Sequence, residues 1–378
     1  RRGGGVQGRG GHVVDERLKF LLLLNYVNAN SQALAKFAAL GVPWRELWSP
    51  SKIDAAATVF TEKQLARIRE AESRAWAENE AERAAKLGAR IISIDDEDYP
   101  ARLLDLRDAP LALYVRGRLN AADKCVAVVG TRRASIYGKN AARSIGEACA
   151  RYGVTLVSGG AFGVDCESQS ACAEACGTTF AVMGTGIDVA YPASNRALFE
   201  KICERGALVT EFPIGAGGDP WHFPQRNRIV AALAEKVVVV EAPLKSGSMI
   251  TARLALELGR EVWAVPGRIT DANAEGTNAL IYDGAYPYIN EKTFFSACGA
   301  QAAEDEGAAR PEARAASLSD EERKIFDYLA ANGEKTIDNI SVAVKMSAAD
   351  ILKNITLMSA KGLVYMPSAG RYGVKGNL

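Results

Sequence analysis

A repeated succession of short apolar runs and glycine turns constrains this chain more than any other feature. Cys125–Val129 is an apolar run that suits a buried parallel strand, and it ends at Gly130. Lys139 to Tyr152 has the apolar spacing of an amphipathic helix, which Gly153 terminates. Val154–Ser158 is the next strand candidate, and a second glycine turn and helix follow it. This order predicts a strand–helix–strand unit with glycine turns at the carboxyl ends of its strands.

The alternation of strand and helix patterns continues to about residue 265. A strict alternation with short connections predicts a doubly wound, Rossmann-like α/β fold with a parallel sheet and right-handed crossovers. In such sheets the carboxyl ends of the strands form the ligand-binding edge. Further strands are expected at Thr179–Met183, Ala207–Thr210, Lys236–Val240 and Glu261–Val265, and helices near Asp165–Cys176, Asn195–Arg205, Asn227–Leu233 and Ser248–Gly259.

The rest of the chain divides by composition. The first residues are basic and glycine-rich, which is typical of disorder, and they precede helical patterns with a capping box at Thr61 and Gln64 and a long helix to about Leu87. Three helix patterns and two short strands near the end predict a winged helix. The expected segments are a disordered tail (1–12), a helical domain (13–88), the Rossmann-like domain (89–297), a linker (298–316) and the winged-helix domain (317–378).

Composition excludes several classes of protein. The apolar content of 48% and charged content of 24% are those of a soluble globular protein. The formal net charge is +1, so any affinity for polyanions must come from local patches. Seven cysteines without CxxC spacing and two histidines predict buried thiols in a reducing cytosol, and no metal site. The apolar run Phe20–Leu24 is too short to span a membrane and is expected in an ordinary first helix.

Several turns at the expected ligand-binding edge are suited to phosphate. Bare backbone amides in glycine turns and at helix N-termini favour anions, and Arg132 and Arg133 add full positive charge to the first turn. Lys245-Ser246-Gly247-Ser248 would form a similar cradle before a helix. The sequence lacks a phosphate-binding P-loop, a dinucleotide-binding GxGxxG fingerprint and a GxSxG nucleophile elbow. The sequence therefore predicts phosphate binding, but not nucleotide hydrolysis of the P-loop type, dinucleotide binding or hydrolysis by an elbow serine.

The stretch from Trp221 to Arg228 combines aromatic rings with two arginines on a connection entering a helix. A base can stack on Phe223 while arginine holds the neighbouring phosphate. Alternatively, Phe223 belongs to the core, and Arg226 and Arg228 pair with acidic residues. Asp165 could be a helix N-cap, and Glu241 could orient a hydroxyl or an arginine in the cleft.

Taken together and in order, the motifs GTRRAS, SGGAFGVD, GTGIDVAYP, FPQRNRIVAAL, KSGSMITARLALELGR and AVPG resemble those of the DNA-processing protein A (DprA/Smf) family. The resemblance implies a SAM-like helical domain before the Rossmann-like domain and a winged helix after it. It also implies a non-catalytic, cytoplasmic protein without a cofactor. Such a protein binds single-stranded DNA, protects incoming DNA in natural transformation, loads the RecA recombinase and dimerises through the Rossmann-like domain.

The resemblance also implies which residues bind DNA. Three positions depart from the pattern of many relatives, because Phe162, Gln169 and Ala193 stand where those relatives carry basic or histidine side chains. Arg133, Lys139, Arg196 and Lys245 are candidates to compensate. The implied nucleic-acid-binding set is Gly130, Thr131, Arg132, Arg133, Ser158, Gly159, Gly160, Phe162, Gly163, Asp165, Gly184, Gly186, Asn195, Phe223, Arg226, Asn227, Arg228, Lys245, Ser246, Gly247 and Ser248.

Two other functions remain open from the sequence. One is a nucleotide-phosphate hydrolase of the extended Rossmann, lysine-decarboxylase-like type with Glu241 near its cleft, although the sequence lacks a PGGxGT turn. The other is a sequence-specific regulator that reads duplex DNA with its winged helix. The basic complement there is thin, namely Lys345, Lys353 and Lys361.

Overall fold

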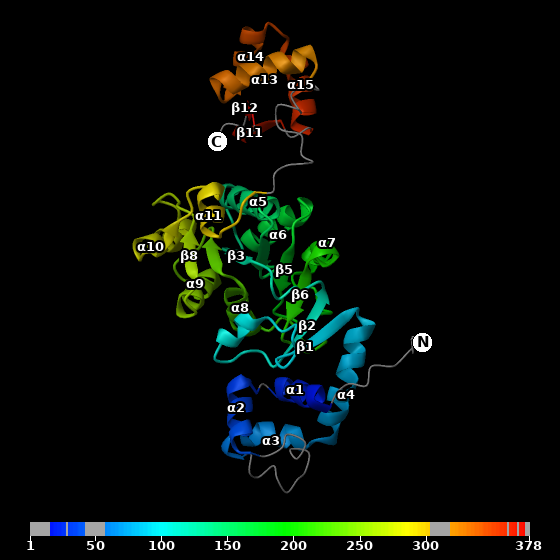
Figure 1. The fold of residues 1–378 in the computed structure, drawn as a ribbon. Coiled ribbons are helices and arrows are strands. Elements are labelled where there is room, and N and C mark those ends of the chain that lie inside the picture. The colour runs from blue at the N-terminus through cyan, green and yellow to red at the C-terminus, as the bar shows by residue number, and fades with distance from the viewer. Residues whose placement is uncertain are drawn as a thin grey trace, which may run out of the picture. The chain divides into compact units, whose positions relative to one another are not determined.

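The computed structural model describes residues 16–27, 29–41, 57–302, 318–360, 363–368 and 370–374. The chain divides into two compact units, residues 1–302 and 303–378 (Figure 1). The tail predicted at residues 1–12 and most of the predicted linker lie outside the described residues. No described helix is long and apolar enough to cross a membrane.

A nine-stranded sheet in the order β1-β2-β6-β5-β4-β3-β7-β8-β9 forms the centre of the first unit, as far as the structure describes it. Strands β3 to β9 run parallel, and the two strands that precede them in the chain pair antiparallel at one edge. The chain proceeds outward from β3 in one direction and returns to its other side at β7, so the topological switch point lies between these two strands. The strands are β1 (Ala89–Ser93), β2 (Ala112–Gly117), β3 (Cys125–Val129), β4 (Thr155–Ser158), β5 (Thr179–Val182), β6 (Ala207–Thr210), β7 (Lys236–Val239), β8 (Glu261–Ala264) and β9 (Tyr286–Pro287).

Helices cover both faces of this sheet (Figure 1). All residues of β3 are buried, and successive residues point to opposite faces. Ala127 and Val129 belong to the core cluster that contains residues of α8, whereas Val126 and Val128 belong to the cluster formed with α5. The helices of this domain are α5 (Ile136–Arg151), α6 (Val164–Glu174), α7 (Arg196–Arg205), α8 (His222–Leu233), α9 (Gly247–Glu257), α10 (Glu275–Tyr282) and α11 (Glu291–Ala297).

Two of these helices begin three or more residues earlier than predicted. Helix α5 starts three residues before Lys139, because Ser135 caps it by accepting a hydrogen bond from the amide of Gly138. Helix α8 starts at His222 rather than near Asn227, without a side-chain cap. Pro224 fits there because the first turn of a helix has no internal acceptor for its amides. The arginines of the Trp221–Arg228 stretch therefore lie on a helix, not on a connection.

The helices before the sheet are α1 (Glu16–Tyr26), α2 (Ser31–Ala39), α3 (Glu62–Arg69) and α4 (Ala71–Lys86). The run Phe20–Leu24 is completely buried, and its core cluster includes Tyr114 of β2. The capping box of Thr61 and Gln64 is present. The predicted long helix is wrong, because the chain becomes extended at Glu70 and α4 begins anew.

Glu80 is an acidic residue of α4 that lies inside the protein. Its side chain is completely buried, and Oε1 accepts a hydrogen bond from the amide of Ile214 at 2.8 Å. Arg83 donates to its other oxygen at 3.0 Å. This carboxylate therefore links α4 to the segment that follows β6.

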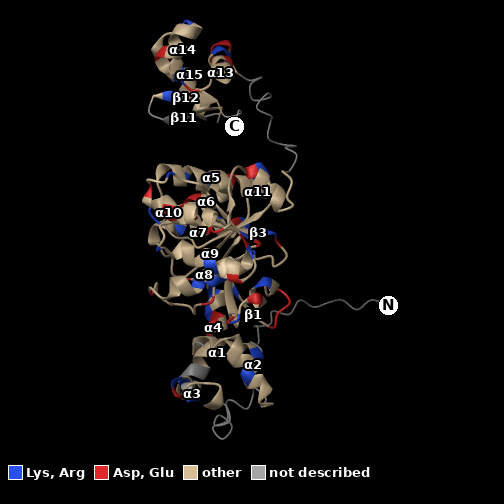
Figure 2. Cartoon of the chain, turned by 90° about the vertical axis from the view of Figure 1, so that its left-hand side faces the viewer, with Lys and Arg blue, Asp and Glu red and all other residues tan. Residues whose placement is uncertain are grey.

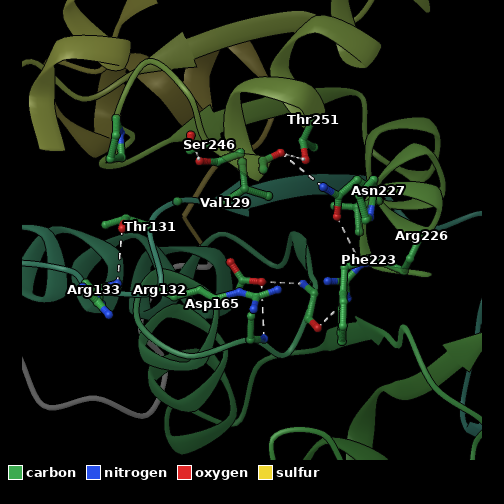
Figure 3. Close-up of a pocket in the computed structure, with 18 of the residues that line it drawn as sticks. Val129, Thr131, Arg132, Arg133, Asp165, Phe223, Arg226, Asn227, Ser246 and Thr251 are labelled. Carbon is green, nitrogen blue, oxygen red and sulfur yellow. Dashed lines mark hydrogen bonds between the residues drawn. The ribbon is translucent and has the colours of Figure 1, made fainter. Parts of the chain in front are cut away.

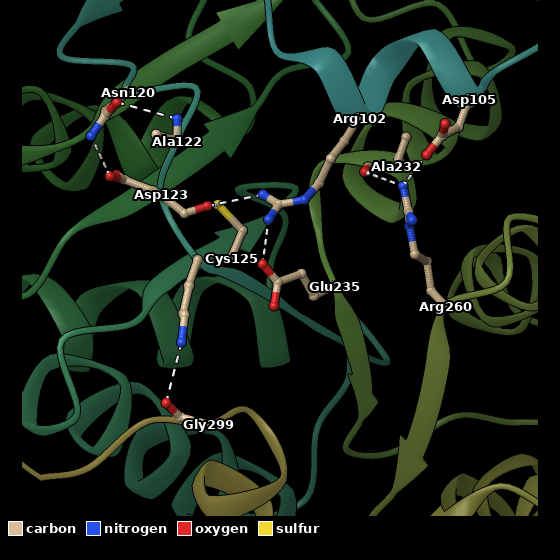
Figure 4. Close-up of polar contacts among 11 residues, drawn as sticks. Arg102, Asp105, Asn120, Ala122, Asp123, Cys125, Ala232, Glu235, Arg260 and Gly299 are labelled. Atoms are coloured by element: carbon tan, nitrogen blue, oxygen red, sulfur yellow. Dashed lines mark hydrogen bonds and ion pairs between the residues drawn. The ribbon is translucent and has the colours of Figure 1, made fainter.

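Two internal ion pairs lie at the amino-terminal edge of the sheet (Figure 4). Arg102, in the short 3₁₀ helix Ala101–Asp105, pairs with Glu235 and donates to the carbonyl oxygen of Asp123 at 2.9 Å. Arg260, just before β8, pairs with Asp105 at 2.6 Å. These pairs hold the 3₁₀ helix against the starts of β3, β7 and β8. Both arginines are therefore already paired with carboxylates of the protein.

The second unit contains three helices and a small antiparallel sheet in its described part. Strands β10, β12 and β11 pair in that order, and the core includes Ile325, Ile340 and Ile355. Ser319 and Glu322 form a capping box at the first helix. The elements are α13 (Asp320–Asn332), β10 (Lys335–Thr336), α14 (Ile337–Val344), α15 (Ala348–Ala360), β11 (Val364–Ser368) and β12 (Arg371–Val374). Strand β10 is an addition to the sequence-based expectation, and Lys361 lies outside the described residues.

Candidate nucleic-acid interface

A cavity of about 600 Å³ opens at the carboxyl edge of the parallel strands (Figure 3). The turns after β3, β4 and β7 and the first part of α8 form its walls, so it lies at the topological switch point. It brings together the following residues of the predicted set: Gly130, Thr131, Arg132, Arg133, Gly159, Asp165, Phe223, Arg226, Asn227, Lys245, Ser246, Gly247 and Ser248.

The first two glycine turns interlock. The carbonyl oxygen of Thr131 accepts a hydrogen bond from the amide of Val164 at 3.3 Å. A Cβ at Gly130 would lie 2.5 Å from the Val164 side chain. Gly163 has φ +73°, and a Cβ there would lie 2.3 Å from the carbonyl oxygen of Thr131. Only glycine allows this approach, which fixes the exposed Arg132 at the cavity wall.

Glu241 holds the turn after β3 in place through hydrogen bonds to Thr131 and Ser135. Its buried carboxylate accepts hydrogen bonds from the amide of Ser135 at 2.9 Å and from the hydroxyl at 2.5 Å. Its carbonyl oxygen accepts from the amide of Thr131 at 2.7 Å. Glu241 thus orients a hydroxyl, but that hydroxyl belongs to the N-cap of α5 and does not line the cavity.

Asp165 is not the N-cap of its helix. Helix α6 begins at Val164 with Gly163 as the cap residue, and Asp165 lies in the first turn. Its carboxylate accepts hydrogen bonds from the amides of Gly159 at 3.1 Å and Ala161 at 3.4 Å, so it shapes the second glycine turn. Burial raises the pKa of this carboxyl group, and it does so against the opposing attraction of the Arg226 charge.

Arg226 and Arg228 lie on different sides of α8, because two helical positions are about 200° apart. Arg226 forms part of the cavity floor, where it donates to the carbonyl oxygens of Gly159 at 2.5 Å and of Val182. Burial lowers the pKa of its guanidinium to about 10. It therefore supports the second turn from inside.

Arg228 is outside the cavity. It pairs with the buried Glu211 at 2.5 Å and with Asp108 at 3.0 Å. Sequence reasoning left such pairing open as an alternative, and the geometry of Arg228 follows it. Arg228 was predicted to bind nucleic acid, but it does not lie with the cationic side chains that line the cavity.

Two aromatic rings form one wall of the cavity. The Phe223 and Tyr191 ring centres are 5.1 Å apart, with 38° between their planes. The guanidinium of Arg132 lies 5.1 Å from the centre of the Phe223 ring. A Cβ at Gly184 would lie 2.8 Å from the Phe223 ring, so this glycine makes room for it. Sequence reasoning missed Tyr191 as a site residue. Its signal was the Tyr-Pro pair in the loop after the third glycine turn.

The N-terminus of α9 faces the cavity from the other side. Ser246 is its N-cap and accepts a hydrogen bond from the amide of Met249 at 3.4 Å. Gly247 and Ser248 follow as first residues of the helix, where backbone amides have no helical acceptor. Asn227 donates to the carbonyl oxygen of Gly247 at 3.2 Å, which ties α8 to this terminus.

Several predicted residues support the cavity without lining it. The hydroxyl of Ser158 donates to the carbonyl oxygen of Val128 at 2.7 Å, and Asn195 donates to that of Gly160 at 3.0 Å. Phe162 is 51% exposed and lies outside the cavity. The remaining members of the predicted set that do not line the cavity are Gly160, Gly163, Gly184, Gly186 and Arg228.

The departure at Gln169 is not a loss of surface charge. This side chain is completely buried, accepts from the amide of Gly160 at 3.1 Å and donates to Thr179 and Phe180 at 3.1 Å each. Lys139, a candidate to compensate, lies 3.9 Å from the carboxylate of Glu167. Within the cavity itself, Arg132, Arg133 and Lys245 are exposed.

The charge of the cavity differs from that of the surrounding surface. Figure 2 shows Lys and Arg interspersed with Asp and Glu over the chain. The cavity, by contrast, is lined by four cationic side chains and one carboxylate, Asp165. Among the described residues no group of three or more His, Cys, Asp or Glu side chains could hold a metal ion. Fold and site therefore define a Rossmann-like protein with a cationic, aromatic-walled cavity at the switch point of its sheet.

Comparison with known proteins identifies the family. Residues 90–299 match the model of the DNA recombination-mediator protein A family, and the chain belongs to this family. Protein Smf of Synechocystis is 39% identical over 223 residues, which are 58% of this chain and 56% of that protein. The chain thus spans about half the length of this relative.

Two solved structures are similar as well. DNA processing protein A (DprA) of Streptococcus pneumoniae has a TM-score of 0.63 and 29% identity, over 74% of this chain and 97% of that one. The protein of the same name from Helicobacter pylori, described for its single-stranded DNA binding mode, has a TM-score of 0.51 and 30% identity. That likeness covers 55% of this chain and 94% of the other.

Proposed function

We propose that this chain is a non-catalytic protein that binds single-stranded DNA in the cavity. The observation that carries the proposal is the combination of exposed Arg132, Arg133 and Lys245 with the Phe223–Tyr191 wall. Phosphates would pair with these cations and with the first amides of α9. A base would stack on the aromatic wall when Arg132 moves from the Phe223 ring to a phosphate.

Family membership and the Helicobacter pylori relative support this proposal. We infer from them a role in recombination: protecting incoming DNA during natural transformation and loading the RecA recombinase in the cytoplasm. We also infer a homodimer formed through the Rossmann-like domain. Residues 13–88 would be its SAM-like domain, 89–297 its DNA-binding domain, 298–316 a linker and 317–378 a winged helix.

A titration with fluorescent oligo(dT) tests DNA binding. If Arg132, Arg133 and Lys245 each neutralise one phosphate, the logarithm of affinity falls with the logarithm of salt concentration with a slope of about −2, since each contact contributes about −0.7. Arg132→Ala removes one contact and would therefore make the slope less negative by about 0.7. The exposed Arg205, at the end of α7 and therefore at the opposite edge of the sheet, provides a matched control. Absence of binding at low salt would contradict the proposal.

The hydrolase alternative gains no support from the cavity. Glu241 is buried against Ser135 and does not line the cavity, and Asp165 is held by two backbone amides. Incubation with nucleoside monophosphates tests it, and release of base would revive it. Deleting residues 317–378 tests the duplex-reader alternative: an unchanged affinity for oligo(dT) argues against the winged helix as the main DNA reader.

A further inference from the structure

A second exposed surface lies beside the cavity at the same edge of the sheet. Ile136 and Tyr137 begin α5, and Arg268 and Ile269 lie in the loop after β8. We call these four residues the outer ridge. Ile136 is 81% exposed, Tyr137 54% and Ile269 94%. These are large apolar side chains that the fold leaves in solvent.

Hydrogen bonds join the outer ridge to the cavity wall. The Tyr137 hydroxyl donates to the carbonyl oxygen of Pro266 at 2.9 Å, which ties α5 to the loop after β8. Asn273 of the same loop donates to the carbonyl oxygen of Arg133 at 3.0 Å. Since Arg133 also lines the cavity, one turn borders both surfaces. The turn that contains Arg133 therefore joins the outer ridge to the cavity, and these two hydrogen bonds hold the turn and α5 against the loop after β8.

The charge of this surface favours a polyanion. Arg133 and Arg268 are exposed, and neither forms an ion pair with any residue that the structure describes. Asp271 is an exposed carboxylate in the same loop, so this surface is cationic only when Arg133 of the adjoining cavity turn is counted together with Arg268.

We propose that a DNA strand held in the cavity continues over the outer ridge. Tyr137 provides a ring on which a further base stacks, Arg133 and Arg268 pair with successive phosphates, and Ile136 and Ile269 contact the sugars. The combination of unpaired guanidinium groups with an exposed ring is the pattern that binds single strands without sequence preference. This extension rests on the proposed function of the cavity.

Oligonucleotide length separates the two surfaces. Affinity would be measured at low salt for a short oligo(dT) of about 4 nucleotides and a long one of about 16 nucleotides, the two ends of the usual range of single-strand site sizes. The variant Tyr137→Ala/Arg268→Glu is expected to bind the short strand like the wild type and the long strand about tenfold more weakly. Its salt slope for the long strand should be smaller by about 0.7. Equal affinities of variant and wild type for both lengths would overturn the extension. Failure of both proteins to bind either length would instead contradict the cavity proposal.

Matched substitutions distinguish contact from structural damage. Tyr137→Phe keeps the ring and Arg268→Lys keeps the charge, so both should retain most of the long-strand affinity. Arg205→Glu makes the same charge change at the opposite edge and should have no effect beyond that of net charge. Photocrosslinking with 5-iododeoxyuridine placed along the long strand should label a peptide that contains Tyr137. Labelling confined to the cavity peptides would overturn the proposal.

Discussion

The guanidinium of Arg132 lies 5.1 Å from the centre of the Phe223 ring, so the main phosphate-binding candidate rests on the main base-stacking candidate. A cation over an aromatic face contributes about 0.5–1 kcal/mol at an exposed site. Single-strand binding exchanges this contact for a phosphate pair and a stacked base. The two residues come from separate parts of the chain, and the glycines at positions 130, 163 and 184 permit their approach.

Phe223 should affect DNA affinity through its ring. Phe223→Leu keeps apolar bulk against Gly184 but removes the stacking face, and we expect it to weaken oligo(dT) binding by ~1–3 kcal/mol. Fluorescence anisotropy measures this loss, and thermal denaturation checks the fold. Phe162→Leu is a matched control at an exposed ring outside the cavity. An equal loss in both variants would argue against stacking on Phe223.

Asp165 should make DNA affinity depend on pH. Its pKa is raised from 3.8 by burial, so it takes up a proton at higher pH than an exposed aspartate does. Protonation removes the one carboxylate of the cavity, and affinity should therefore rise as the pH falls toward that raised pKa. Asp165→Asn keeps an acceptor oxygen for the amides of Gly159 and Ala161. It should bind more tightly at neutral pH, with a flatter pH profile.

The comparison of wild type and Asp165→Asn between neutral and acidic pH isolates this carboxyl group from other titrations. A variant whose affinity keeps the full pH dependence of the wild type would show that another group controls it.

Arg228 should affect stability and not DNA contact. Removing it leaves the buried Glu211 without its partner, and breaking a buried pair in this way costs about 3–5 kcal/mol. Arg228→Met should therefore lower the free energy of unfolding, as measured by urea denaturation, and Arg228→Met/Glu211→Gln should recover part of it. Folded Arg228→Met protein should bind oligo(dT) like the wild type. Arg132→Ala should show the reverse, with normal stability and weak binding.

Gly184→Ala tests the packing behind the aromatic wall. The added Cβ would lie 2.8 Å from the Phe223 ring, so the ring must shift. We expect lower oligo(dT) affinity with a folded protein. Gly217→Ala is a suitable control nearby, because no atom lies within 4 Å of a Cβ at that position. Equal oligo(dT) affinity of the two variants would show that DNA binding does not depend on the position of the Phe223 ring.

The sequence predicted the parallel strands β3 to β8 because apolar runs such as Cys125–Val129 and turn glycines are local signals, whereas the antiparallel edge of β1 and β2 was not predicted. It also predicted more than half of the residues that line the cavity, because the carboxyl ends of parallel strands meet at one edge of the sheet. It misplaced the start of α8, because Trp221 offers no capping side chain. Consequently Arg226 and Arg228 were expected on one surface.

Residues whose surroundings depend on tertiary contacts could not be predicted in this way. Gln169 looked like a lost surface charge, but its amide satisfies Gly160, Thr179 and Phe180 inside the core. Tyr191 reaches the cavity only because the loop after β5 folds back toward Phe223. Glu80 lies on a charge-rich helix, and its burial follows from contact with Ile214 at a separation of 134 positions.

A crystal structure of the protein with a short oligo(dT) bound tests the central claim most directly. We predict a phosphate within hydrogen-bond distance of the Arg132 guanidinium, about 2.7–3.2 Å, and a base stacked on Phe223. An oligonucleotide bound elsewhere on the chain, with Arg132 still resting on the Phe223 ring, would contradict the account.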